Sequence, residues 1–356
     1  MSWPKKLRFL LLYLVVPLPL LGFWAGGFYN FITVATLFAL IPIIDYVIKD
    51  SYNPAATEET HLLQDHFFIN VILFYVPLQI ILLLAGIFLI SHYSLHWYEW
   101  LGFTLSIGLI TGGGGINLAH ELMHKNNNFQ QMMSKILLIT VCYGHFFIEH
   151  VRGHHVKVAT PEDPSSARFG ESLYRFLPRT IIGSFKSALH LENKRLMQKK
   201  QAFFSHHNQF LWIIGAPATI AILCFLYGGW AALLFFLGQA VVAFVVLEIV
   251  NYVEHYGLER KKLANGHYEC VSYRHSWNAN HWLSNALLYH LQRHSDHHAH
   301  GARPYQLLKH HDESPQLPSG YLGMIILALI PPLWFAIMDK RVLSYRKENC
   351  LNRPRQ

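Results

Sequence analysis

The sequence predicts an all-α integral membrane protein with six transmembrane helices and a histidine-rich helical cap on the cytoplasmic side. Three observations support this: an apolar composition, a one-sided distribution of basic residues, and histidines gathered in three short clusters. Of the 356 residues, 52% are hydrophobic and only 14% are charged, a balance typical of membrane-embedded chains. Because no linker-like stretch divides the chain, we expect residues 1–356 to form a single integral-membrane domain.

Six segments are long and apolar enough to cross the hydrocarbon core, which takes about 20 residues in a helix. They lie near Phe9–Phe28, Phe31–Ile48, Phe67–Ile90, Trp100–Leu118, Phe210–Tyr227 and Trp230–Val250. The first two are expected to form a hairpin around Gly26-Gly27, and the last two another around Gly228-Gly229. Since further spans follow the first, we interpret it as a transmembrane helix rather than a signal peptide.

Basic residues set the predicted orientation. With the N-terminus inside, the external connections lie near residues 29–30, 91–99 and 228–229, and none of them contains Lys or Arg. All 29 basic residues then fall on the cytoplasmic side, as the positive-inside rule requires. Topology and attraction to anionic lipid therefore account for the net charge of +8, and no nucleic acid partner is expected.

Two features of the spans have alternative interpretations. Asp45 and Glu248 are the only acids inside them, and they are either solvated near the cytoplasmic ends or line a site or channel. The glycine run Gly112–Gly115 either permits a close helix approach or forms a flexible turn.

Histidines form three clusters with spacings of one, three, four or five residues. Residues three or four apart on a helix share a face, so each cluster is able to direct imidazoles at one point. The predicted topology places all three clusters on the same membrane face, which indicates a metal cluster. Imidazole suits iron, copper and zinc. The residues are His120 and His124 in the first cluster, His150, His154 and His155 in the second, and His294, His297 and His298 in the third.

The first cluster, taken alone, also fits a zinc protease or a pair of histidines that binds no metal. His120-Glu-Leu-Met-His124 matches the HExxH pattern of zinc proteases, and a chance or structural pair is the second alternative. A catalytic zinc ion needs only three protein ligands, so eight clustered histidines exceed that requirement. A ninth candidate, His255, lies four residues after Asn251 at the end of the sixth span, where both are either polar residues that cap the span or part of the site.

Five polar residues are candidates for orienting the imidazoles, as partners of metal-bound histidines do. Four of them adjoin a candidate ligand in sequence and point away from that ligand's helix face, so they would hydrogen-bond to candidate ligands on other helices. The equal alternative is that these side chains are solvated at the surface. The candidates are Glu121, Glu149, Asn251, Glu254 and Asp296.

The four cysteines are scattered, without a CxxC pair, and no glycine-rich dinucleotide fingerprint follows a strand. We therefore expect no cysteine-ligated electron carrier within the chain, and we expect electrons for redox chemistry to come from outside.

Longer strings around the clusters resemble the membrane-bound alkane 1-monooxygenases, within the fatty acid desaturase and hydroxylase superfamily. The Leu-Gln-Arg-His-Ser-Asp-His-His string discriminates against the desaturases and the xylene monooxygenases. The resemblance covers most of the chain. The strings are His120-Glu-Leu-Met-His124-Lys125, Glu149–His155, Val158–Pro164, Asn251–Gly257 and Leu291–Ala299.

This resemblance implies a non-haem di-iron centre, with His255 as the ninth ligand, in the bacterial inner membrane. It implies hydroxylation of the terminal methyl of medium- to long-chain n-alkanes to 1-alkanols with O2. An apolar channel between the first four spans would admit the alkane. A related di-iron membrane enzyme, hydroxylating or desaturating acyl chains or alkyl-aromatics, is the alternative.

The resemblance also implies rubredoxin as electron donor, itself reduced by an NADH-dependent rubredoxin reductase. A small acidic carrier would fit the basic face, although contact with lipid headgroups accounts for the same residues equally well. These residues include Arg152, Lys157, Arg168, Arg260, Lys261 and Lys262.

Overall fold

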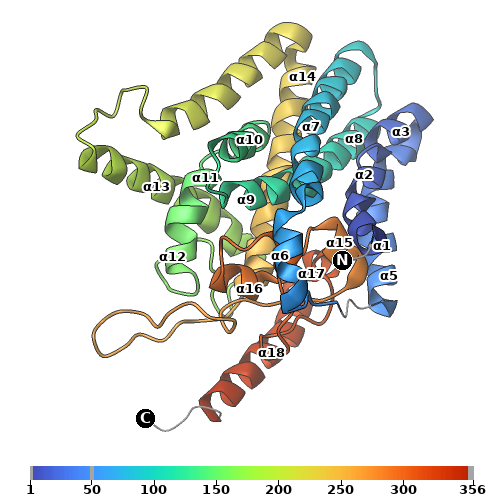
Figure 1. Cartoon of the computed structure of the whole chain (residues 1–356). Coiled ribbons are helices and arrows are strands. Elements are labelled where there is room, and N and C mark those ends of the chain that lie inside the picture. The colour runs from blue at the N-terminus through green and yellow to red at the C-terminus, as the bar shows by residue number, and fades with distance from the viewer. Residues whose placement is uncertain (1–2, 49–51, 352–356) are drawn as a thin grey trace.

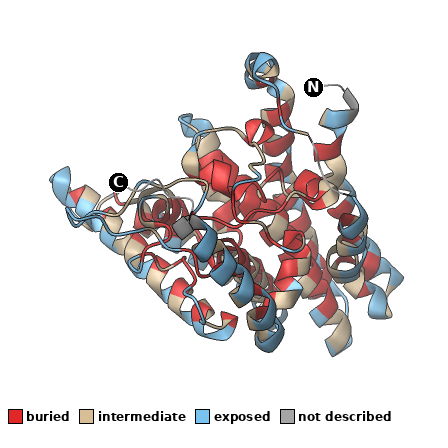
Figure 2. Ribbon diagram, turned by 90° about the horizontal axis from the view of Figure 1, so that it is seen from below, coloured by how far each residue is buried: buried red, intermediate tan, exposed pale blue. Residues whose placement is uncertain are grey.

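The computed structural model describes residues 3–48 and 52–351. Lys49, Arg353 and Arg355, which belong to the predicted basic face, lie outside these residues. In the described part the fold is helical, and β-structure is limited to the isolated bridges of Lys262 with Tyr268 and Asn278 with Gln316. The prediction of an all-α chain is confirmed. Figure 1 shows the long helices side by side, and Figure 2 shows the buried residues gathered where they meet.

Within residues 3–48 and 52–351, five helical stretches are long and apolar enough to cross a membrane. They are Lys5–Ala25, Gly27–Val47, His66–His92 (α7), Trp97–Met123 and Gln209–His255 (α14). The second includes the π-helical η3 (Thr36–Leu40), and the fourth runs through α8 (Trp97–Leu109), the π-helical η4 (Ile110–Ile116) and α9 (Asn117–Met123). The fifth and sixth predicted spans share α14, so the count of six stays a prediction.

Helix α14 is broken where the sequence predicts a hairpin. Gly228 and Gly229 have non-helical backbone angles, with Gly229 at φ 62°. A straight helix of its 47 residues would measure roughly 70 Å, more than twice the ~30 Å hydrocarbon core. In Figure 1 the yellow arm instead turns back at the top of the molecule and the golden arm descends beside α7.

The three connections predicted to be external lie at one end of the helices. The amide of Gly27 donates to Glu99 Oε1 at 2.6 Å, which joins the first connection to the second. The rings of His92 and Tyr227 are 5.9 Å apart, which brings the second beside the break in α14. The histidine clusters lie away from this end (Figure 1), and their cytoplasmic placement stays a prediction.

The two acids of the spans are buried and hydrogen-bonded. Asp45 accepts from the amides of Leu283 and Ser284 at 3.0 and 3.2 Å. Glu248 accepts from the hydroxyls of Tyr143 and Thr180 at 2.6 and 2.7 Å. Each is only 1% exposed, so the expectation that they are solvated is wrong. They join distant segments, as satisfied buried carboxylates do.

The glycine run in η4 permits close packing, as one interpretation of the sequence expects. A Cβ on Gly112 would lie 2.7 Å from the Cα of Ala243 in α14, and a Cβ on Gly114 or Gly115 would collide with side chains of α7. Gly113 differs, because its Cβ would meet nothing within 4 Å.

Shorter helices and loops complete the fold and carry most of the histidines. Two further apolar stretches, residues 130–147 and 322–338, are too interrupted to be predicted as spans. The first includes a helix, Asn128–Ile139, beside α9, and the second is divided before Pro331, where a new helix begins. The remaining helices of eight or more residues are α3 (Leu18–Ala25), α6 (Ala56–Gln64), α10 (Asn128–Ile139), α13 (Leu173–Gln198), α17 (Tyr321–Ala328) and α18 (Pro331–Leu351).

Candidate metal centre

Four segments position the nine candidate ligands. His120 lies in α9 and His124 caps its end. The second cluster occupies η5 (His150–His154) and the start of α12 (His155–Lys157). His255 is the last residue of α14, and the third cluster forms α16 (His294–Ala299).

The structure brings all nine histidines together in two neighbouring groups, each with ligand atoms within 4.8 Å of one another. The rings of His155 and His298, one from each group, are 4.5 Å apart. The first histidine group is His120, His124, His150, His155 and His297, and the second histidine group is His154, His255, His294 and His298.

The spacing of the nitrogens fits a shared metal ion. Within the first histidine group, His155 Nε2 lies 3.0 Å from His150 Nε2 and 3.1 Å from His297 Nε2. In the second, the Nε2 atoms of His294 and His298 are 2.9 Å apart. Two nitrogens bound at right angles to one ion at about 2.1 Å would be about 3 Å apart.

Several of these nitrogens are buried without a protein partner. The Nε2 atoms of His120, His124, His154 and His255 have none among the described residues. A buried polar atom left unpaired costs about 1–3 kcal/mol, and a bound cation would satisfy it. Burial, with the charge of neighbouring imidazoles, also holds the pKa of His294 well below its usual range, so this side chain is in the neutral form that binds metal.

The second and third clusters each divide between the two groups, which the helical-face argument did not predict. In η5 the backbone is π-helical, a form that closes i→i+5 hydrogen bonds. His150 therefore meets His155, five residues on, while His154 turns to the second histidine group. In the α-helical third cluster, His294 pairs with His298, four residues on, and His297 joins the first group.

Asp163 orients one candidate ligand, and sequence reasoning did not assign it that role. It is 1% exposed, and its Oδ2 lies 2.9 Å from His154 Nδ1. The hydroxyl of Ser166 donates to the same oxygen at 2.6 Å. Although burial acts to raise it, the neighbouring His154 lowers the pKa of Asp163 below its usual range. A carboxylate hydrogen-bonded to Nδ1 leaves Nε2 free to bind a metal. The sequence signal that could have identified Asp163 is its position within the Val158–Pro164 string.

Of the five predicted orienting residues, only Glu254 pairs with one of the nine histidines in the described part of the chain. Its Oε2 lies 3.2 Å from His294 Nε2. Glu121 pairs with Lys125 at 2.5 Å, and Asn251 Nδ2 donates to Glu248 at 3.1 Å.

Among the described residues, neither Glu149 nor Asp296, the remaining two predicted orienting residues, pairs with any of the nine histidines. Asp296 receives two hydrogen bonds from Arg303 at 2.7 and 2.8 Å, so it fixes the loop after α16. Both carboxylate oxygens of Glu149 are buried without a hydrogen-bond partner among residues 3–48 and 52–351. Burial with the charge of Asp163 raises the pKa of Glu149 to about 8.

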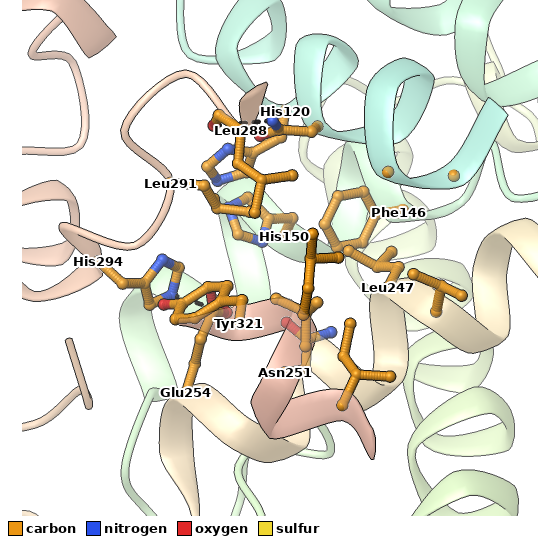
Figure 3. A pocket seen from close by; sticks show the side chains of 17 residues that line it. His120, Phe146, His150, Leu247, Asn251, Glu254, Leu288, Leu291, His294 and Tyr321 are labelled. Atoms are coloured by element: carbon orange, nitrogen blue, oxygen red, sulfur yellow. Dashed lines mark hydrogen bonds and ion pairs between the residues drawn. The ribbon is translucent and has the colours of Figure 1, made fainter. Parts of the chain in front are cut away.

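An apolar cavity is lined by histidines of both groups. Figure 3 shows His120, His150 and His294 facing it from three different segments, with Glu254 and Tyr321 beside His294. Most of its remaining wall is aliphatic or aromatic. We call this cavity the inner chamber. A molecule within it would contact apolar side chains and candidate metal ligands.

The comparisons with known proteins agree with this arrangement. The Fatty acid desaturase family model matches residues 95–328. The chain is 43% identical to Alkane 1-monooxygenase 2 of Pseudomonas aeruginosa, over 97% of this chain and 94% of that protein. The chain belongs to the alkane 1-monooxygenases of the fatty acid desaturase family. This confirms the resemblance inferred from the histidine strings.

Other alkane 1-monooxygenases match at similar levels, and a protein of different specificity matches less well. Alkane 1-monooxygenase 1 of Pseudomonas aeruginosa is 46% identical over 90% of this chain and 84% of its own length. The xylene/toluene monooxygenase hydroxylase component of Pseudomonas putida is 28% identical over 94% of this chain and 88% of its own length. The order of these identities favours the alkane 1-monooxygenases over the xylene branch.

Proposed function

We propose that the protein is a membrane-bound di-iron monooxygenase that converts medium- to long-chain n-alkanes to 1-alkanols. An alkane, O2, two electrons and two protons give the alcohol and water. The observation that carries this proposal is the inner chamber, whose apolar wall ends on ligands of both histidine groups. Nine histidines in two groups exceed what one zinc ion needs. The proposed iron ligands are His120, His124, His150, His154, His155, His255, His294, His297 and His298.

The chain's own residues position the alkane and exclude water from it. Bound irons supply the oxidising power for an unactivated C–H bond, which side chains lack. The inner chamber holds the alkane by apolar contact, worth about 0.8 kcal/mol per buried methylene. Because His120, His150 and His294 face the inner chamber (Figure 3), an alkane held there would have its terminal methyl beside them.

Product and metal analysis test this proposal together. Purified protein supplied with rubredoxin, its NADH-dependent reductase and octane or hexadecane is expected to form the 1-alkanol. Elemental analysis is expected to find about two irons per chain, one for each histidine group. One zinc per chain would contradict the metal assignment. An olefinic acyl product without any alkanol would instead favour the alternative of a related enzyme for acyl chains.

For electron delivery we propose a basic cleft beside the second histidine group as the contact for rubredoxin. His275 lines this cleft, and its carbonyl accepts from His255 Nδ1 at 3.4 Å. Arg152 is less suited, because it pairs with buried Glu192 at 3.2 Å. The cleft contains more cations than anions: Arg260, Lys261, Lys262, Arg274 and Arg346 against Glu259 and Glu269.

Charge reversal in the basic cleft is expected to weaken electron delivery without loss of iron. In Lys261→Glu/Lys262→Glu, both altered side chains are exposed, so the fold should persist. Lost steering should raise the KM for reduced rubredoxin on the order of 10-fold at low salt and flatten its salt dependence. The matched control is Lys199→Glu/Lys200→Glu, another exposed pair outside the cleft. Equal effects in both variants would contradict the docking site and favour a general surface-charge effect.

A further inference from the structure

A second apolar cavity adjoins the inner chamber on the side of the first two spans. Leu12 and Val15 of the first span and Leu37 and Phe38 of the second line it. We call it the outer chamber. Leu37 and Phe38 belong to the π-helical η3, in which no residue is buried. The outer chamber therefore lies against a helix face that would meet lipid.

The two chambers share part of their lining. We define the neck as the residues that line both. It comprises Gly113 of η4, Val246 of α14, Leu288 and Leu322. All four are apolar, and they come from four separate segments of the chain. The inner chamber ends on metal ligands, while the outer chamber contains none of the nine histidines in its lining. An alkane too long for the inner chamber has to pass the neck.

Gly113 is the glycine in the neck whose lack of a side chain is not required by the packing of neighbouring helices. Its neighbours in the run are glycine because a Cβ would collide with α14 or α7, as at Gly112 against Ala243. A Cβ on Gly113 meets no atom within 4 Å. In a helix, glycine costs roughly 1 kcal/mol relative to alanine. A side chain at Gly113 would therefore occupy free space at the boundary of the two cavities that this residue lines.

We propose that Gly113 sets the upper limit of alkane length, because its missing side chain lets the far end of the substrate extend from the inner into the outer chamber. This inference rests on the proposed alkane hydroxylation and adds the residue that selects among alkanes. Short alkanes would be held by the inner chamber alone. Long alkanes would need both chambers, with the terminal carbon at the histidines and the remainder beyond the neck.

The test is the ratio of kcat/KM for hexadecane to that for octane in Gly113→Phe. Excluding two or three methylenes from the outer chamber corresponds to roughly 15- to 60-fold in kcat/KM, so the ratio should fall at least about 10-fold. Val246→Phe, in α14 at the neck, should lower the ratio in the same way. The matched control is Gly215→Phe: Gly215 is another helical glycine with nothing within 4 Å of its Cβ, on the exposed side of α14. Its ratio should equal that of the wild type.

A wild-type ratio in folded Gly113→Phe overturns the neck proposal, while alkane hydroxylation itself stands. If the phenylalanine variant does not accumulate, Gly113→Val replaces it in the test and is expected to lower the same ratio by a smaller factor. An unchanged ratio in Gly113→Val would also overturn the proposal. Failure of the wild type to form alkanol from either alkane would overturn the proposed function instead, so the two failures are distinguishable.

Discussion

Replacing His255 with alanine is expected to abolish alkane hydroxylation and to lower the iron content by about one ion per chain. The second histidine group would keep three imidazoles, and His255 supplies a buried Nε2 that has no partner among the described residues. Removing one of four ligands leaves a weaker, more open site, which is why both iron and turnover should fall. Elemental analysis and octane turnover are the two measurements.

His145→Ala is the matched control for that variant. His145 is also a buried histidine whose Nε2 has no partner in the described part of the chain, but it lies in neither group. Its loss should lower thermal stability and leave the iron content unchanged. Wild-type iron and turnover in His255→Ala would show that this histidine only caps the sixth predicted span.

Asp163→Asn is expected to weaken iron binding 10- to 100-fold, the usual cost of removing the partner of a metal-bound histidine. The amide is nearly isosteric with the carboxylate but carries no charge, so its hydrogen bond to His154 Nδ1 is weaker. A competition titration with a chelator measures the affinity directly. Turnover at saturating iron should recover at least in part, because the nine ligands remain.

The adjacent Glu162 offers a control of equal charge change. Glu162 is exposed whereas Asp163 is buried, so Glu162→Gln should keep wild-type affinity. If both variants lose iron equally, the effect comes from net charge near the site and not from the pairing with His154.

The eight clustered histidines were predictable because their spacing is local, whereas His255 was added through the family resemblance. Each cluster is a short string of one residue type, and imidazole chemistry restricts what such a string does. The helical fold was predictable for a similar reason, since apolar stretches of about 20 residues have few alternatives in a bilayer. The break in α14 followed from paired glycines between two such stretches.

The division of the clusters between two groups was not predictable, because it depends on the π-helical turn at His150–His154. Sequence periodicity assumes a uniform α-helix. The pairing of Asp163 with His154 depends on how a loop folds back. The neck depends on residues as distant in sequence as Gly113 and Leu322. These features arise from tertiary packing, which one residue string does not reveal.

The shared segments have a thermodynamic consequence. His154 and His155 are bonded neighbours that serve different groups, and so are His297 and His298. A metal ion bound to one group would immobilise the backbone that positions the histidines of the other group. The second ion would therefore bind without a second loss of conformational entropy. Linkage of this kind is reciprocal, and uptake should be positively cooperative. At less than one equivalent of iron, native mass spectrometry should show chains with no ion or with two, while singly loaded chains stay scarce.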